Sequence, residues 1–370
     1  MARDIVVIGA GIVGCAIASE LARRGALVSI LDGRAPGAGA TQASGGMLAP
    51  YTEAAEGGPL LALGARSLAL FDEFVRAIEA DSGVAVEYER SGTLHVARVE
   101  QTLAHFASMH QELGQLGVPA ELLSPAAARA HEPNLAADIF GGLILPTQGL
   151  ISAPGMTQAM VEASRQRGAT LLPQAIATRV RRCGTHVAID TDHGMVEADA
   201  VVLACGAWSG QVEVEGASGA VPVHPVRGQL LHLGWHGPHV ARITWDEHCY
   251  LVPWRDGTLL VGATVEDAGF EEQTTVAGVR QLLEAVCDLL PNAWRATLLS
   301  ARVGLRPGSP DPLPIIGWSE VVPGLMYATG HYRNGVLLAP LTAHLVADAI
   351  VDGRIDEALS VTSPARFGSM

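Results

Sequence analysis

Three glycines and one aspartate near the start of the chain have the types and spacing needed to bind a dinucleotide. Gly9, Gly11 and Gly14 form a G-x-G-x-x-G pattern, and Asp32 ends the next apolar run. In this pattern the glycines allow a tight turn, a close approach of the backbone to a pyrophosphate, and close packing of a helix on a strand. A carboxylate at Asp32 can accept hydrogen bonds from ribose hydroxyls. We therefore predict a dinucleotide site in this segment.

The elements that must position this turn are visible in the same segment. Residues 5–8 and 27–31 are short apolar runs rich in branched side chains, which is typical of buried parallel strands. Residues 11–24 between them are expected to form a helix whose N-terminus points at the phosphates. Strand, turn, helix, strand and acid thus occur in register. A tightly packed turn without a ligand is the alternative interpretation.

Two later segments are expected to join the same sheet. Residues 199–205 form an apolar strand that ends at Gly206 and Trp208, where a glycine lets the backbone approach a ligand. Residues 325–328 form another strand, and a glycine-flanked turn over 330–335 then opens the last helix. The nucleotide-binding fold is therefore predicted to come from the start, the middle and the end of the chain.

Strands with a different character are inserted between these pieces. They carry aromatic residues, are separated by hairpin signals, and are expected over 226–233, 240–244, 248–254, 258–264 and 297–304. We predict an α/β protein in which a mostly antiparallel sheet covers the substrate. The nucleotide-binding domain is expected to comprise residues 1–85, 149–215 and 305–370, and the substrate-binding domain residues 86–148 and 216–304.

Composition and charge exclude several classes of function. The 370-residue chain has a formal net charge of −14, which would repel nucleic-acid phosphates. All 24 basic residues are arginine, which excludes a lysine Schiff base, a phosphate-loop lysine and a lysine general base. The five cysteines are scattered, and no uninterrupted apolar run reaches the ~18–20 residues of a spanning helix. We expect a protein of the reducing cytoplasm, with no nucleic-acid partner and no membrane span.

Further motifs along the chain resemble the D-amino-acid oxidase superfamily of flavoproteins, and within it most closely the glycine oxidases of thiamin (thiazole) biosynthesis. The resemblance covers essentially the whole length. The residues that carry it are 8–14, 44–49, 200–209, 226–229, 248–253, 303–307 and 330–340. The first of these segments is shared by many nucleotide-binding proteins, whereas the last three occur in far fewer families.

The resemblance implies a fold and a reaction. The fold would be a Rossmann-like FAD-binding domain interleaved with a mostly antiparallel substrate domain. The reaction would be oxidative deamination of glycine or another small amino acid, such as sarcosine or a D-amino acid. Hydride would pass to flavin N5, the imino acid would hydrolyse to a keto acid and ammonia or amine, and molecular oxygen would reoxidise FAD to give hydrogen peroxide. Relatives of this type assemble as homotetramers, so a homo-oligomer is expected, with Trp235 and Trp245 either at an interface or in the core.

The resemblance also assigns roles to four residues of the substrate site. Arg306 matches the arginine that grips the substrate carboxylate, for which a planar guanidinium with two parallel bonds is suited. Tyr250 matches a tyrosine whose hydroxyl adds a second bond to that carboxylate. Arg333 matches a further active-site arginine, and His248 is expected to line or hydrogen-bond within the pocket. The alternatives are a structural ion pair for Arg306, an ordinary sheet aromatic for Tyr250, a phosphate or surface arginine for Arg333 and a structural histidine for His248.

The residues predicted to contact the cofactor either are small or are expected to lie beside its flat ring. Several of them belong to a loop-rich segment over 33–58. The full set is Gly9, Gly11, Gly14, Asp32, Ser44, Gly46, Met47, Gly206, Trp208, Gly330, Tyr332, Arg333, Asn334 and Gly335. No cysteine follows Cys287, so the covalent flavin link of sarcosine-oxidase relatives is not expected and the FAD should be non-covalent. Those relatives also use lysines, which this chain lacks. No metal site is predicted.

Three other functions stay open at this point. A dehydrogenase for D-amino acids or N-methyl amines would pass electrons to a carrier instead of oxygen. A 2-hydroxy-acid oxidoreductase would share the architecture, and an NAD-binding or non-catalytic module would share the glycine motif alone. Pocket volume decides between glycine and larger amino acids, and Val265 is a candidate position for that choice.

Overall fold

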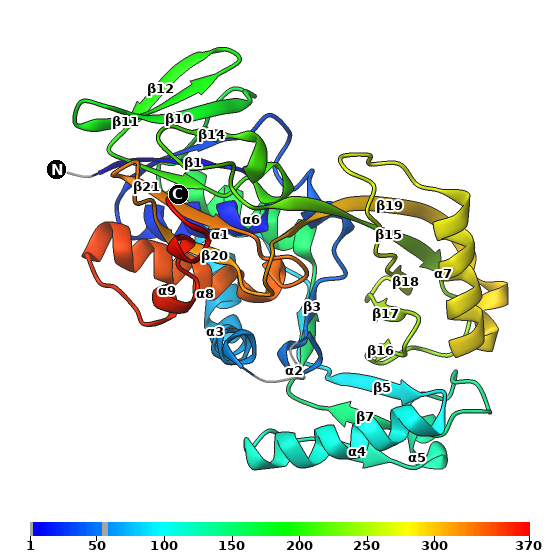
Figure 1. Cartoon of the computed structure of the whole chain (residues 1–370). Coiled ribbons are helices and arrows are strands. Elements are labelled where there is room, and N and C mark those ends of the chain that lie inside the picture. The colour runs from blue at the N-terminus through cyan, green and yellow to red at the C-terminus, as the bar shows by residue number, and fades with distance from the viewer. Residues whose placement is uncertain (1–2, 54–57) are drawn as a thin grey trace.

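A six-stranded sheet forms the centre of the computed structural model, which describes residues 3–53 and 58–370 (Figure 1). Its strand order is β20-β21-β13-β1-β2-β9, and all neighbouring strands are parallel except β20 and β21. The strands are β1 (Asp4–Ile8), β2 (Leu27–Leu31), β9 (Thr170–Leu171), β13 (Ala200–Leu203), β20 (Ile315–Trp318) and β21 (Leu325–Thr329). As predicted, they come from the start, the middle and the end of the chain.

This sheet is covered on both faces, which explains its continuous apolar strands. Successive side chains of a strand point to opposite faces, so Ile5 and Val7 of β1 pack into one core cluster while Val6 and Ile8 pack into another. The helices on the first face are α1 (Ile12–Arg23), α3 (Pro59–Ser82), α6 (Ala153–Gln166) and α8 (Gly335–Ala347). The opposite face carries a four-stranded sheet of β10 (Ala177–Cys183), β11 (His186–Thr191), β12 (Gly194–Ala198) and β14 (Glu213–Val214).

The helix α8 is a core helix. By length and composition the segment Gly335–Asp352 is apolar enough to cross a membrane, but 72% of it is buried inside the protein. It lies against α1 and α3, and its own residues belong to the cluster that fills the space beneath the sheet.

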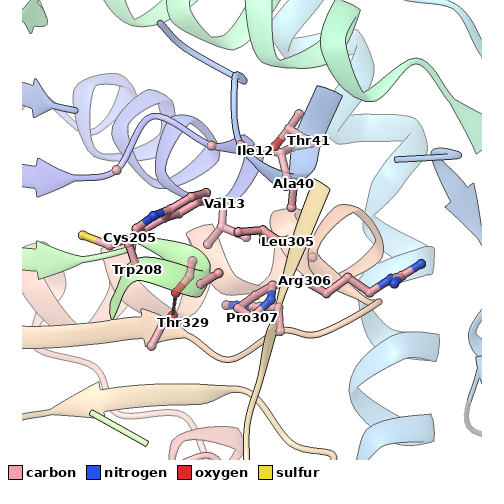
Figure 2. A pocket seen from close by; sticks show the side chains of 18 of the residues that line it. Ile12, Val13, Ala40, Thr41, Cys205, Trp208, Leu305, Arg306, Pro307 and Thr329 are labelled. Atoms are coloured by element: carbon pink, nitrogen blue, oxygen red, sulfur yellow. Dashed lines mark hydrogen bonds between the residues drawn. The ribbon is translucent and has the colours of Figure 1, made fainter. Parts of the chain in front are cut away.

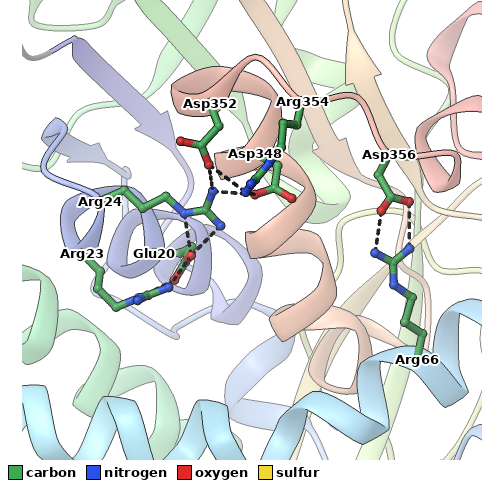
Figure 3. A network of polar contacts seen from close by, with 8 residues as sticks. All are labelled: Glu20, Arg23, Arg24, Arg66, Asp348, Asp352, Arg354 and Asp356. Atoms are coloured by element: carbon green, nitrogen blue, oxygen red, sulfur yellow. Dashed lines mark hydrogen bonds and ion pairs between the residues drawn. The ribbon is translucent and has the colours of Figure 1, made fainter.

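Ion pairs tie the end of α1 to the segment that follows α8 (Figure 3). Arg24 Nη1 lies 2.5 Å from Asp348 Oδ1 and 2.6 Å from Asp352 Oδ2, and its Nη2 lies 2.7 Å from Glu20 Oε1. Arg354 pairs with the same two aspartates. Such shared pairs add more than isolated surface pairs because several charges fix one another. The N-terminal helix and the C-terminal segment are thereby held together.

A second, eight-stranded sheet stands beside the first (Figure 1). Its order is β19-β15-β18-β17-β16-β5-β7-β6, and its neighbouring strands are antiparallel except β16 and β5. The strands are β5 (Thr93–Ala97), β6 (Glu121–Leu123), β7 (Gly141–Leu145), β15 (His224–Gly234), β16 (Ile243–Trp245), β17 (Tyr250–Pro253), β18 (Thr258–Gly262) and β19 (Thr297–Gly308). The helices α4 (Glu100–Gln115), α5 (Pro125–His131) and α7 (Val276–Leu289) pack against it.

Small elements connect the two large sheets. They are a three-stranded sheet of β3 (Met47–Leu48), β8 (Gly149–Ile151) and β4 (Tyr88–Glu89), and the short helix α2 (Pro50–Glu53). Another short helix, α9 (Ala358–Val361), packs into the helical core of the central sheet. The loop expected over 33–58 thus contains a 3₁₀ turn at Ala40–Ala43, β3 and α2, and its residues 54–57 lie outside the described residues.

The end of one strand differs from the prediction. The strand expected to end at residue 304 continues to Gly308, so that Arg306 pairs with Val226 in the middle of a ladder. Pro307 has no N–H to donate, but β19 is an edge strand, where a proline is tolerated. Residues 306–317 are rich in proline and glycine, yet the end of this segment lies in the edge strand β20, Ile315–Trp318.

Candidate active site

One cavity of about 590 Å³ brings most of the predicted site residues together (Figure 2). It runs from the ends of β1 and β2, past the loop before β3, to β17 and β19. The predicted residues that line it are Gly9, Gly11, Asp32, Ser44, Gly46, Met47, Gly206, Trp208, Tyr250, Arg306, Tyr332, Arg333, Asn334 and Gly335. Figure 2 shows Trp208 and Arg306 on opposite sides of this space.

The turn after β1 is built so closely that side chains would not fit. Gly9 has φ +111°, and a methyl group placed on it would lie 2.7 Å from the carbonyl carbon of Ala204. A methyl group on Gly14 would lie 2.9 Å from the carbonyl carbon of Gly9. Gly14 does not itself line the cavity, and its role is to let α1 pack on the turn. Gly330, at φ +70°, likewise shapes the second turn from behind, where a methyl group would lie 3.2 Å from Ile315 Cγ1.

The N-terminus of α1 opens toward this cavity. Gly11 is its N-cap and supplies no side-chain cap, while Ile12 N donates to Thr41 Oγ1 at 3.0 Å. Asp32 Oδ2 accepts from Ala10 N at 2.6 Å, and its Oδ1 accepts from Arg34 N at 2.8 Å. A carboxylate offers about four acceptor positions, so these two bonds leave Asp32 able to accept from ribose hydroxyls. Helix dipole, amides and carboxylate together suit a dinucleotide.

Arg34 was not predicted as a site residue, and it closes one edge of the cavity. Its Cζ lies 4.2 Å from the centre of the Trp208 ring, which is cation–π distance. Its Nη1 also pairs with Glu272 Oε2 at 2.7 Å, and Phe270 lies 6.0 Å from Trp208 between ring centres. Three segments far apart in the sequence therefore meet beside Asp32. An arginine in a loop gives no sequence signal for such a role.

The turn before α8 forms the opposite wall. Tyr332 is held at φ 47°, which is unusual for a residue other than glycine, and its N donates to Pro307 O at 3.0 Å. His331 beside it is buried, and its Nε2 lies 3.1 Å from Thr342 Oγ1. Burial lowers the pKa of His331 to about 4, so this imidazole is neutral at physiological pH. His331 lines the cavity and was also missed from sequence.

Arg306 extends from β19 across the neighbouring strand. Its Nη1 donates to Thr264 O at 3.1 Å and to Arg227 O at 3.3 Å. The guanidinium lies where a side chain on Gly228 would be, because a methyl group built there would lie 2.5 Å from Arg306 Cζ. The glycine in β15 is therefore what allows this arginine to lie flat over the sheet.

Tyr250 has a similar arrangement on the next pair of strands. Its ring packs over Gly262 of β18, where a methyl group would lie 2.7 Å from Tyr250 Cε2. Trp245 lies 5.5 Å from the Tyr250 ring between centres, and Arg333 Cζ lies 5.7 Å from the centre of the Trp245 ring. Tyr250 and Arg333 thus both lie beside one tryptophan.

His248 does not join them. It was expected on a strand over 248–254, where it would share a face with Tyr250 because strand side chains alternate. Instead β17 begins at Tyr250, and His248 is exposed in the preceding turn, where its N donates to Asp246 Oδ1 at 2.8 Å. Within the described part of the chain it is not among the residues around the cavity. Val265 is likewise exposed and away from it.

Comparison with known proteins decides the family. The model of the family described as FAD dependent oxidoreductase (DAO) matches residues 4–349. This chain belongs to that family. FAD is the family's cofactor, and the open helix N-terminus, the side-chain-free turn at Gly9 and the acceptor Asp32 all fit it.

The chain is similar over most of its length to several glycine oxidases and to a bifunctional relative. The glycine oxidase of Geobacillus kaustophilus is 31% identical over 94% of this chain and 92% of its own length. The bifunctional protein ThiO/ThiG of a Nostoc species is 35% identical over 97% of this chain, which spans only 54% of that relative's length. Among solved structures, glycine oxidase from Geobacillus kaustophilus has a TM-score of 0.93 and 31% identity, with 99% of each chain covered. The chain therefore has the fold of glycine oxidase.

Proposed function

We propose that this protein oxidises glycine or another small amino acid, such as sarcosine or a D-amino acid, to the imino acid, with FAD as hydride acceptor and molecular oxygen as the final oxidant. One observation carries the proposal. A single cavity runs from the dinucleotide turn to Arg306 and Tyr250, so that a carboxylate-binding group and the cofactor share one space. The names of the 31%-identical relatives support the same activity.

The residues of this chain would bind and orient rather than transfer protons. Arg306 would bind the substrate carboxylate through two parallel charge-assisted bonds, and the Tyr250 hydroxyl would donate a further bond. Arg333 belongs to the turn before α8 and lies beside the Trp245 ring, where it would add positive charge beside the amino acid. FAD supplies the hydride-accepting N5 when it is bound. Positioning of the amine over that atom is the protein's contribution to the rate.

The electron acceptor separates this proposal from its main alternative. A dehydrogenase that reduces a carrier would need the same clamp and the same cofactor. Solved relatives above 25% identity include an iminodiacetate oxidase from Chelativorans sp. BNC1, with a TM-score of 0.87 and 26% identity. That name supports an oxidase acting on a small amine with a carboxylate.

The division of the chain into two domains is also a proposal. The two large sheets support an FAD-binding domain of residues 1–85, 149–215 and 305–370 and a substrate-binding domain of residues 86–148 and 216–304. The strand β19 crosses the boundary at residue 304, so Arg306 belongs by sheet membership to the substrate side.

Assembly, location and pathway stay predictions. The resemblance predicts a homotetramer, and the scattered cysteines predict the reducing cytoplasm. The product would feed either thiazole synthesis or amine catabolism. Trp245 is partly buried, and its ring centre lies 5.8 Å from that of His95 and 5.5 Å from that of Tyr250, which supports a place in the core rather than at an interface. Exposed apolar side chains in the 3₁₀ turn before β19 and at the start of that strand support an oligomer: Trp294 is 79% exposed and Leu299 50%. Light scattering of the purified protein measures the assembly directly.

The function is tested by anaerobic bleaching of the flavin absorbance. The panel is glycine, sarcosine, D-alanine, D-proline and 2-hydroxyglutarate. We expect rapid bleaching by glycine or another amine and return of the colour in air. Bleaching that air does not reverse would indicate a dehydrogenase, and bleaching by the hydroxy acid alone would contradict the amine chemistry. Purified protein that holds no FAD would contradict the proposal as a whole.

A further inference from the structure

The Arg306 guanidinium is held by two carbonyl groups on two different segments. One carbonyl belongs to Arg227 in β15, and the other belongs to Thr264, just after β18. A bidentate bond to a carboxylate depends on the angle of the guanidinium plane. Whatever fixes these two carbonyls therefore also fixes how Arg306 faces its ligand.

Glu266 connects the two segments through both its backbone and its side chain. Its backbone forms an isolated antiparallel bridge with Arg227, with N to O distances of 2.9 and 3.0 Å. Its carboxylate accepts from Arg227 Nη2 at 2.6 Å and from the hydroxyl of Thr264. One carboxylate is thus bonded to both of the residues whose carbonyls hold Arg306.

The surrounding bonds make this cluster rigid. Gln229 Nε2 donates to Glu266 Oε1 at 2.7 Å, and Gln229 N donates to Thr264 Oγ1 at 2.9 Å. Gln229 and Thr264 are buried, at 0% and 2% exposed. Gln229 Oε1 also accepts from the N of Thr275, the residue that caps α7. A buried network with its members paired in this way has one low-energy arrangement.

The charge of Glu266 is maintained by the same bonds. Burial alone would raise its pKa, but the hydrogen bonds from Thr264, Arg227 and Gln229 outweigh burial, and the pKa lies below its usual range. The carboxylate is therefore ionised at neutral pH. Within the described part of the chain Glu266 is not among the residues that line the cavity, so it does not itself contact a ligand there, and Arg306 is the lining residue held by its partners.

We propose that Glu266 is a positioning residue for substrate binding, which orients Arg306 by fixing the carbonyl groups of Thr264 and Arg227. This inference rests on the proposed function, because it takes Arg306 as the group that binds the substrate carboxylate. It adds that the binding geometry is set by a carboxylate that never touches the substrate. An arginine on the same strand without this support would sample several orientations and bind more weakly.

The test compares Glu266→Gln with Glu271→Gln in the FAD-loaded enzyme. Glu271 is a matched control, since its Oε2 also faces Arg227, at 3.7 Å, but its side chain is 74% exposed. Acetate is the probe, and its binding is followed through the flavin absorbance. We expect Glu266→Gln to raise the acetate Kd and the amino-acid KM about tenfold, with kcat within about twofold. Glu271→Gln should change neither the acetate Kd nor the amino-acid KM. In both variants the FAD content and the Tm should stay near those of the parent.

The outcomes separate this inference from the function on which it rests. Normal acetate binding by Glu266→Gln, with binding lost in Arg306→Ala, would overturn the positioning role and leave the proposed clamp intact. Normal acetate binding by Arg306→Ala would overturn the clamp itself. If Glu266→Gln fails to fold, Thr264→Val and Thr264→Ser replace it, because valine keeps the shape of threonine without the hydroxyl that reaches Glu266, and serine keeps that hydroxyl without the methyl group. Weak binding by the valine variant with recovery in the serine variant supports the role, and equal binding by the two contradicts it.

Discussion

The two ends of the cavity are built by different means. At the dinucleotide end the ligand would meet backbone, in a turn made possible by Gly9 and closed by α1 within one continuous segment. At the substrate end it would meet side chains, Arg306 and Tyr250, which come from two strands of another sheet and lie over glycines of two more. A backbone site tolerates few changes at its glycines but needs few partners. A side-chain site depends on the partners that hold each group in place.

The largest effect is expected at the side-chain end. Arg306→Ala removes two charge-assisted hydrogen bonds to the substrate carboxylate, a loss of about 4 kcal/mol. This corresponds to a rise in KM of roughly a thousandfold. Steady-state kinetics with the best substrate of the panel measures it. Arg302→Ala, on the same strand but away from the cavity, is the control and should keep the parent KM. A small change in Arg306→Ala would remove the contrast between the two ends.

Acid should destabilise the fold on both sides of this comparison, because the sheet that carries Tyr250 and the turn before α8 each contain a buried neutral histidine. Burial lowers the pKa of His95 in β5 and of His331 in the turn before α8 to about 4. Between pH 6.5 and 4 the unfolded chain binds protons at these positions and the folded chain does not. The free energy of unfolding therefore falls as the pH falls through this window, by about 3 kcal/mol for each histidine at most.

Urea unfolding at several pH values measures this dependence. His331→Gln should make the acid limb shallower. His105→Gln, at an exposed histidine of α4, is the comparison variant and should leave the acid limb unchanged. An unchanged acid limb in His331→Gln would show that this histidine is not the group that titrates.

A smaller effect is expected at the backbone end. Gly9→Ala should lower the free energy of unfolding by about 2 kcal/mol and reduce FAD content, because the new methyl group is strained at positive φ and also meets the Ala204 backbone. Gly25→Ala is the control. Its φ is +82°, but among the described residues other than its chain neighbours no atom lies within 4 Å of the added methyl group, so it should show the backbone strain alone, about 1 kcal/mol. Equal losses in the two variants would contradict the close approach at Gly9.

The smallest effect sharpens the comparison further. Asp32→Ala removes one acceptor from the ribose and should raise the FAD dissociation constant about tenfold. Asp32→Asn keeps an acceptor, so its FAD dissociation constant should lie between those of the parent and of Asp32→Ala. Fluorescence of released FAD during dialysis measures the difference. An alanine variant that retains FAD as the parent does would show that the backbone turn alone holds the cofactor.

The same contrast explains what could be predicted from the sequence. The turn at Gly9, Gly11 and Gly14 and its two strands were predicted correctly, because their partners are close in sequence and each residue type has a local reason. The interleaving of the central sheet was predicted because similar apolar strands occur at the start, in the middle and near the end of the chain. The matched positions Arg306, Tyr250 and Arg333 all line the cavity.

Contacts that depend on strand register could not be predicted. Gly228 makes room for Arg306 only because β15 and β19 pair as they do, and nothing near Gly228 in the sequence indicates it. Glu266 was missed for the same reason. Arg34 and His331 were missed because they lie in a loop and in a turn, where no periodicity indicates which way a side chain points. The prediction that His248 lies in the pocket was wrong, because a shift of one or two residues in the start of β17 decides whether a side chain faces the cavity or the solvent.

The order in which the strands of the central sheet are synthesised has a consequence for the newly made chain. The strand β1 emerges first, yet its neighbour β13 begins at Ala200, and the strand beyond that begins at Leu325. At ribosomal speeds this delay is on the order of tens of seconds. Through that time one side of β1 is an unpaired apolar edge, the kind that joins other chains. The cofactor cradle thus forms only after almost the whole polypeptide has been released, and a chain cut short before β21 is expected to aggregate without binding FAD.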